Sequence, residues 1–211
     1  PSQVVAQFAF PPCETYSLAC RCNINRCPPC HYRIPGDPTH PPRDDDSPYA
    51  AKAKLHDELV QRILGSWSSE LRAGRDQLFW MENPVGDLAT RDFMDPFTSQ
   101  AAMGRHTVDY CAYGHPFQKP THVWTSSAWS PRGATGTGRC GKECPQGFVG
   151  SKGCWRHPEG LGRGRTLLPK GPDRKKQVNS VPVSLQLEWL DALPDPEPGR
   201  DTIVDLCSGW G

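Results

Sequence analysis

The sequence lacks any apolar run near the ~20 residues that a transmembrane helix requires, and its first residues lack the basic and then apolar pattern of a secretory signal peptide. These absences predict an intracellular protein that does not associate with a membrane. The sequence also lacks an excess of positive or of negative charge. The 24 Lys and Arg stand against 23 Asp and Glu, so the net charge of +1 favours no class of partner.

Hydrophobic residues are scarce, at 36% of 211, whereas 23 Pro and 20 Gly predict much irregular backbone. The 7 Trp, 7 Phe and 5 Tyr are still enough to anchor a core. Ten cysteines are typical of a secreted disulfide scaffold. Two groups of them have metal-like spacings, one at residues 20–31 and one at residues 140–157. This clustering favours a reducing compartment instead.

Apolar patterning predicts five strands and two helices. The strands are expected at residues 4–10, 78–81, 107–113, 122–125 and 202–206, and the helices at 49–67 and 181–193. In the longer helix an apolar face repeats every four residues, at Ala51, Leu55, Leu59 and Ile63, and Val60 and Leu64 widen it. Strands alternating with a helix through short links predict an α/β sheet.

A basic, glycine-rich segment follows the first four strands. Residues 131–176 contain 11 Lys and Arg against 3 Asp and Glu. They also contain a Cys-x3-Cys-x9-Cys-x2-His pattern, formed by Cys140, Cys144, Cys154 and His157. Four nitrogen and sulfur donors are what structural zinc needs, and a metal would explain how a segment with so few apolar residues folds. The competing interpretation is a set of reduced surface cysteines.

Three strand ends contain residues suited to catalysis, and ligands of α/β sheets bind beyond the carboxyl ends of the strands. These ends read Pro-Pro-Cys-Glu at 11–14, Glu-Asn-Pro at 82–84 and Cys-Ser-Gly-Trp-Gly at 207–211. Singly, each has an ordinary explanation: a small buried cysteine, a turn residue and a chance glycine pair.

Together the motifs resemble those of the cytosine-C5 DNA methyltransferases, in a form similar to the phage-type members. Phe10–Cys13 resembles the Pro-Cys nucleophile loop, and Trp80–Pro84 resembles the Glu-Asn motif. Asp109–Thr125 resembles the later strand pair. Residues 179–182 resemble the final cofactor-side helix, and residues 205–211 resemble the first motif, which is the glycine loop of the cofactor.

The resemblance implies an α/β fold, namely a partial Rossmann-like S-adenosylmethionine-dependent methyltransferase sheet with a loop-rich basic appendage. It implies four parts: residues 1–130 as the catalytic half, 131–176 as a target-recognition-like segment, 177–193 as a cofactor-side helix, and 194–211 as a linker and the first cofactor-binding strand and loop. Because the first motif comes last, we expect a circularly permuted enzyme or a piece of a larger one.

The implied activity is transfer of a methyl group from S-adenosylmethionine to cytosine C5 in DNA, with RNA as an open alternative substrate. The implied location is the nucleus in a eukaryote and otherwise the cytoplasm. Cys13, preceded by Pro12, would be the nucleophile that adds to C6, and Glu82, oriented by Asn83, would bind the base. Weaker contacts to base or phosphate are expected from Lys119 and His122. The implied cofactor-binding residues are Asn179, Asp205, Cys207, Ser208, Gly209 and Gly211.

Two other functions remain open at the level of sequence. One is a non-catalytic nucleic-acid-binding module that retains a methyltransferase scaffold. The other is a zinc-stabilised interaction protein whose strand-end motifs are coincidental.

Overall fold

The structure is a computed structural model that describes residues 3–16, 32–34, 37–39, 41–150, 153, 155–157, 180–195 and 202–208, with backbone alone for 3–5 and 202–208. The chain divides into two compact units. The first unit comprises Pro1–Arg105, His122–Ala128 and Leu193–Gly211, and the second comprises His106–Thr121 and Trp129–Ala192. No helix in the described ranges is both long and apolar enough to span a bilayer.

The main sheet has five strands in the order β3-β4-β2-β1-β7. Their bounds are Gln3–Phe10 for β1, Leu78–Pro84 for β2, Gly104–Asp109 for β3, Pro120–Thr125 for β4 and Thr202–Ser208 for β7. With the helices, this sheet confirms the expected mixed α/β class.

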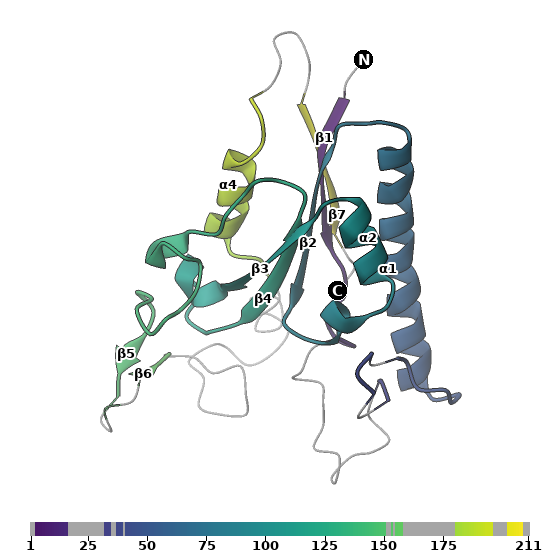
Figure 1. Cartoon of the computed structure of the whole chain (residues 1–211). Coiled ribbons are helices and arrows are strands. Elements are labelled where there is room, and N and C mark those ends of the chain that lie inside the picture. Colours follow the sequence, from purple (N-terminus) through teal and green to yellow (C-terminus); the bar gives the residue numbers. More distant parts are fainter. Residues whose placement is uncertain are drawn as a thin grey trace. The chain divides into compact units, whose positions relative to one another are not determined.

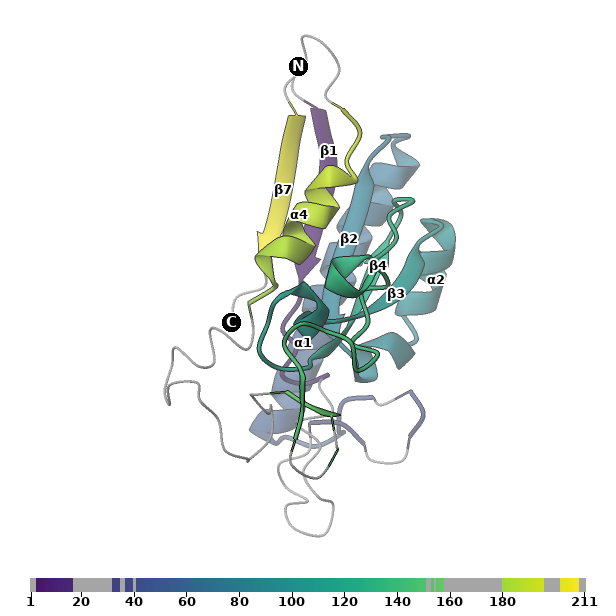
Figure 2. The ribbon, with the colours of Figure 1, turned by 90° about the vertical axis from the view of Figure 1, so that its left-hand side faces the viewer.

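Three of these strands run parallel. β1 pairs with β2 in a register that places Ala9 opposite Met81, and with β7 in a register that places Phe10 opposite Ser208. Figures 1 and 2 show β1 and β7 side by side and pointing the same way. The carboxyl ends of β7, β1 and β2 therefore meet at one edge of the sheet.

Helix α1 spans Pro48–Arg72 and begins at a well-formed cap. The Ser47 hydroxyl accepts a hydrogen bond from the Ala50 N–H at 3.1 Å, and Pro48 occupies the first turn, where its missing N–H costs nothing. The helix extends five residues past the predicted end at Trp67, and Arg72 lies in the last turn, where a cation is favourable.

The predicted buried face of this helix is correct at Val60 and Leu64 and wrong at Ala51 and Leu55. Leu55 is 61% exposed, and Ala51 is exposed as well. The side that packs inward contains Val60 and Leu64 together with Ala50, Ala53, His56, Asp57 and Trp67. The prediction counted only aliphatic residues, whereas a buried aspartate and histidine bind polar partners on this face, and two alanines let the helix approach closely.

The core of the first unit lies between α1, β2 and a short helix α2, Met94–Gln100. Trp67 stacks on Phe79 with ring centroids 4.9 Å apart, and both rings contact Phe97 of α2. Figure 1 shows both helices on the same side of β2. The sequence analysis missed α2 because it is short and contains Pro96. A 3-10 turn, η3 (Asp87–Thr90), precedes it.

β3 ends earlier than the predicted strand at 107–113. After Asp109 the chain enters a 3-10 turn, η4 (Tyr110–Tyr113), which ends at Gly114 with a left-handed φ of 94°. β2, in contrast, continues through Glu82, Asn83 and Pro84 instead of stopping at residue 81. The Glu-Asn motif therefore lies within the last residues of a strand.

The second unit contains η4, a second 3-10 turn η5 (Gly133–Thr135), the two-residue strands β5 (Phe148–Val149) and β6 (Trp155–Arg156), and α4 (Val183–Asp191). β5 and β6 pair antiparallel. Glu188 of α4 accepts hydrogen bonds from the Gly133 N–H at 2.7 Å and the Tyr113 hydroxyl at 3.3 Å. One glutamate thus joins α4 to both 3-10 turns.

Candidate functional site

The nucleophile motif and the Glu-Asn motif are joined at the edge where β1 and β2 end. The Asn83 side-chain amide donates a hydrogen bond to the Pro11 carbonyl at 3.0 Å, and Asn83 is fully buried. Glu82 is 6% exposed, whereas Cys13 is half-buried. The pairing of Ala9 with Met81 places each motif just beyond that matched pair. The structure therefore brings together two motifs about seventy residues apart.

Of the two polar atoms of the Asn83 side chain, the amide nitrogen is hydrogen-bonded and the oxygen is not, among the described residues. Its Oδ1 is buried and has no hydrogen-bond partner among the described residues. Buried polar atoms are rarely left unpaired, and those that are commonly lie at sites that bind a further group.

The residues after Cys13 form a tight turn that contacts buried polar side chains. The Tyr16 N–H donates to the Cys13 carbonyl at 3.1 Å, and the Asp87 N–H donates to the Tyr16 carbonyl at 2.8 Å. The Tyr16 hydroxyl donates to Asp57 of α1 at 2.7 Å. Burial and the adjacent Asp57 raise the pKa of Tyr16, so the phenol stays protonated and keeps this bond.

Asp57 also binds two arginines, and all three side chains are buried. Arg33 donates to both carboxylate oxygens, at 2.7 and 3.1 Å, and Arg91 approaches the carboxylate at 2.8 Å. Arg33 further donates to the Thr15 carbonyl at 2.9 Å, and its guanidinium lies 4.3 Å from the centre of the Tyr16 ring. The turn that carries Cys13 is thus fixed to α1 by a charged network.

Two titratable groups border this turn. Thr15 Oγ1 lies 3.0 Å from His56 Nδ1, and burial, reinforced by Lys52, lowers the pKa of His56. Glu14 is more exposed and pairs with Lys52. Burial raises the pKa of Glu14, but hydrogen bonds from Lys52 and Tyr32 outweigh burial, and the net pKa is lowered.

The other residues implied by the resemblance have different surroundings. Lys119, in the second unit, is 6% exposed with its ammonium 4.7 Å from the centre of the Tyr110 ring. His122, in the first unit, is half-buried with its ring 5.5 Å from that of Trp124. Asp205, Cys207 and Ser208 lie in β7, where the backbone alone is described. Asn179, Gly209 and Gly211 lie outside the described residues.

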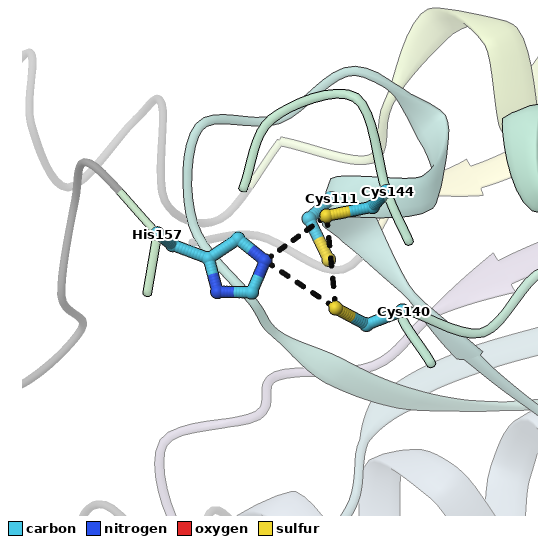
Figure 3. A group of neighbouring side chains, drawn as sticks. All are labelled: Cys111, Cys140, Cys144 and His157. Carbon is cyan, nitrogen blue, oxygen red and sulfur yellow. Dashed lines mark hydrogen bonds between the residues drawn. The ribbon is translucent and has the colours of Figure 1, made fainter. Parts of the chain in front are cut away.

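A second site lies wholly within the second unit and consists of Cys111, Cys140, Cys144 and His157 (Figure 3). One ligand atom from each residue lies within 4.8 Å of the others. The sulfurs of Cys140 and Cys144 are 3.6 Å apart, and His157 Nε2 lies 3.5 Å from Cys140 Sγ and 3.1 Å from Cys144 Sγ. The cysteines are buried, which does not fit the alternative of surface thiols. This group can bind a metal ion such as zinc.

Three of the four predicted ligands are in this group. The fourth predicted ligand, Cys154, lies outside the described residues, and the residue that joins the group instead is Cys111. Sequence reasoning missed Cys111 because it lies twenty-nine positions before Cys140, within a stretch interpreted as a strand. Its 3-10 turn directs the thiol toward the other cysteines, as Figure 3 shows.

The electrostatics of the group differ from one sulfur to the next. Burial raises the pKa of Cys111. Burial also acts to raise the pKa of Cys140, but hydrogen bonds from the Lys142 N–H and from the neighbouring thiols outweigh it, and the net pKa is lowered. Burial lowers the pKa of His157, which favours the neutral imidazole that coordinates metals.

Asp109 braces the same site from behind. Its buried carboxylate accepts hydrogen bonds from the Cys140 N–H at 2.9 Å, from Arg139 Nε at 2.8 Å and from the Gln118 side-chain amide at 3.2 Å. Because Asp109 directly precedes the turn that carries Cys111, one carboxylate fixes the positions of two cysteine-bearing segments.

Comparison of the chain with protein-family models, with curated proteins and with solved structures finds no match.

Proposed function

We propose that the protein transfers a methyl group from S-adenosylmethionine to C5 of cytosine in DNA. The observation that supports this most is the hydrogen bond from Asn83 to Pro11, which couples the Pro-Pro-Cys loop to the Glu-Asn strand end. β7 ends beside β1 at the same edge, so the third motif starts next to the other two. The carboxyl edge of a parallel sheet is where such folds bind substrates and cofactors.

Cys13 is the nucleophile in this proposal. After its thiol loses a proton to solvent, the thiolate attacks C6, forming an S–C6 bond and moving the electrons of the C5=C6 double bond onto C5. C5 then forms a bond to the methyl carbon, and the electrons of the broken S–CH3 bond stay on the cofactor sulfur. Loss of the C5 proton to a base and cleavage of the S–C6 bond restore the double bond and the thiolate.

Glu82 is the acid that binds the base. As a carboxylic acid near N3 and the exocyclic amine, it stabilises the electron-rich ring during attack at C6. Glu82 lies one residue beyond Met81, and Asn83 anchors the next residue to the cysteine loop. The pairing of the two strands and the Asn83–Pro11 hydrogen bond therefore hold the cysteine loop next to the strand end that contains the acid.

The cofactor supplies the methyl group as an electrophilic sulfonium. Asp205, Cys207 and Ser208 of β7 and the glycines that follow would hold it. The backbone fits this assignment, because β7 is parallel to β1 and ends opposite Phe10, which leads directly into the cysteine loop. Glycine allows a cofactor to approach the chain closely.

Duplex DNA hides cytosine C6 within the base stack, so the base must rotate out to reach Cys13, at a cost of a few kcal/mol. A rigid receiving site reduces the entropy lost on binding. The bonds from the Tyr16 hydroxyl and from both arginines to Asp57 provide that rigidity beneath the cysteine turn.

A trapping experiment tests the proposal. Duplex DNA that contains 5-fluorocytosine is incubated with the protein and S-adenosylmethionine. Because fluorine at C5 cannot leave as a proton does, the S–C6 bond persists, and we expect a denaturant-resistant complex whose modified peptide contains Cys13. Cys13→Ser should abolish this complex, and Cys27→Ser, which changes a cysteine that no proposed step uses, should retain it.

A complex mapped to another cysteine, or one that survives in Cys13→Ser, would overturn the proposal. The same reaction with 5-fluorocytosine in RNA identifies the polymer. DNA binding that is equal in the wild type and in Cys13→Ser, with no trapped complex on either polymer, would instead support the non-catalytic binding module.

A further inference from the structure

We propose that Cys111, Cys140, Cys144 and His157 bind one Zn²⁺ ion in a closed, structural site that holds the second unit together. Zinc binds cysteine sulfur at about 2.3 Å and histidine nitrogen at about 2.0 Å, in a tetrahedron. The corners of such a tetrahedron lie about 3.8 Å apart for two sulfurs and about 3.5 Å apart for sulfur and nitrogen. The separations of 3.6, 3.5 and 3.1 Å in the cluster are close to those edges.

The alternatives fit less well. A disulfide needs sulfurs about 2.05 Å apart, whereas the Cys140 and Cys144 sulfurs are 3.6 Å apart, and both thiols are free. Without an ion, these thiols and the imidazole hydrogen-bond to one another, and a thiol is a weak donor and a weak acceptor. A cation gives all four donors a common partner, which is the usual reason for such a group to be buried.

Few apolar side chains surround the ligands themselves. The hydrophobic cluster here consists of the three cysteines themselves, with Trp155 as a partly buried neighbour. The ligands come from three places: the η4 turn, the 140–144 turn and the residue after β6. Metal binding supplies folding free energy in domains of this kind.

The 140–144 turn is arranged to support bound sulfur. The Glu143 N–H donates to the Cys140 carbonyl at 2.8 Å, which tightens the turn. Gly141 and Lys142 both adopt left-handed φ values, of 54° and 64°. A left-handed φ is costly for lysine. The turn nevertheless retains this strained residue, and the Lys142 N–H donates a hydrogen bond to the Cys140 sulfur.

Asp109 orients two of the proposed ligands, as carboxylates next to metal sites often do. It fixes the Cys140 backbone and the start of the Cys111 turn, so both sulfurs are positioned before the ion binds. Groups that orient a ligand in this way typically contribute about 10- to 100-fold to metal affinity.

Metal analysis of the full-length chain, purified under reducing conditions, tests the site. We expect one equivalent of zinc per chain. On replacement with Co²⁺, we expect the intense visible bands of tetrahedral cobalt together with sulfur-to-cobalt charge transfer. A chain without bound metal, or cobalt with the weak pale spectrum of an octahedral oxygen site, would overturn the proposal.

Paired cysteine variants identify the ligands. Cys111→Ser should lower zinc affinity by more than the roughly 10- to 100-fold loss expected for Asp109→Asn, whereas Cys154→Ser should leave affinity unchanged. Loss of zinc in Cys154→Ser with retention in Cys111→Ser would overturn the assignment and restore the ligand set expected from the sequence.

A variant with an additional thiol tests the site even if Cys111→Ser fails to fold. His157→Cys should still bind one zinc, and its Co²⁺ form should show stronger sulfur-to-cobalt charge transfer because four thiolates replace three. An unchanged cobalt spectrum in this variant would exclude His157 as a ligand.

Discussion

Among single residues, Asp57 joins segments that are far apart in the sequence. It binds Tyr16, Arg33 and Arg91, and each of these side chains is buried. A buried carboxylate that neutralises two guanidinium groups is costly to remove, because the cations would then be buried without a partner. Its position below the Cys13 turn links stability to the proposed chemistry.

Asp57→Ala should lower the free energy of unfolding by about 3–5 kcal/mol, the usual effect of removing one partner from a buried ion pair. Urea denaturation measures the change. Glu58→Ala, an exposed acidic position next along the same helix, is the matched control and should change stability by less than about 0.5 kcal/mol. Equal effects of the two substitutions would show that the network contributes nothing specific.

The pKa of His56 predicts how stability depends on pH. Burial lowers this pKa; Lys52 and Arg33 lower it further, while Glu14 and Asp57 raise it. Above the ordinary pKa of 6.5 both the folded and the unfolded states hold a neutral ring. As the pH falls below that value, the unfolded chain takes up a proton that the folded chain resists, so stability decreases toward the folded pKa.

His56→Asn removes this titration and keeps a hydrogen-bonding atom near Thr15 Oγ1. We expect the loss of unfolding free energy between pH 7.5 and pH 5 to be smaller in the variant, as measured by urea midpoints at both pH values. Burial also lowers the pKa of His106 and His115, so part of the loss remains. An equal or larger loss in the variant would contradict the assigned direction.

Among the elements, α2 ends in a motif that usually contains glycine. The Met103 N–H donates to the Thr98 carbonyl at 2.8 Å and the Ala102 N–H to the Ser99 carbonyl at 3.3 Å, which is a Schellman ending. Ala102 has a left-handed φ of 50° there. The side chain of Ala102 is exposed, so its Cβ gains little burial in return for the strain.

Ala102→Gly should therefore raise the free energy of unfolding by about 1 kcal/mol, because glycine adopts this φ without the clash that alanine suffers. Ala51→Gly, the same substitution at an exposed position inside α1, should instead lower it by about 1 kcal/mol. Thermal denaturation of both variants checks the pair. A decrease in both would show that the α2 ending is not strained.

At the scale of the whole molecule, the two units are stabilised in different ways. The first unit has an aromatic core around Trp67, Phe79 and Phe97. The second unit also buries aromatic side chains, among them Tyr110, Phe117 and Trp189, and in addition it gathers three cysteines and a histidine that can bind a metal. Removal of metal is therefore expected to affect the units unequally.

Chelation of zinc should increase amide hydrogen exchange in residues 106–121 and 129–157, because these segments lose the ion that they bind in common. Exchange in α1 and β2 should stay slow, since their core contains no metal ligand. Mass spectrometry of peptides with and without chelator measures both. A uniform increase along the chain, or no increase, would contradict independent stabilisation by the metal.

Sequence alone determined the two longer helices, the strands of the main sheet and the chemical character of the strand ends. Apolar periodicity and turn residues are local signals, so β1, α1, β4, α4 and β7 lie close to their predicted positions. Local signals also indicated three of the four clustered metal-ligand candidates, because Cys140, Cys144 and His157 are near one another in the chain.

Tertiary structure decided the rest, because it depends on contacts between distant residues. Asp57 and Trp67 belong to the buried face of α1 because of polar partners and aromatic packing, which no periodicity of aliphatic residues reveals. Cys111 joins the other cysteines only because the chain leaves β3 in a 3-10 turn. The meeting of Cys13 with the Glu-Asn motif likewise requires the parallel pairing of β1 with β2, a choice made by the whole sheet.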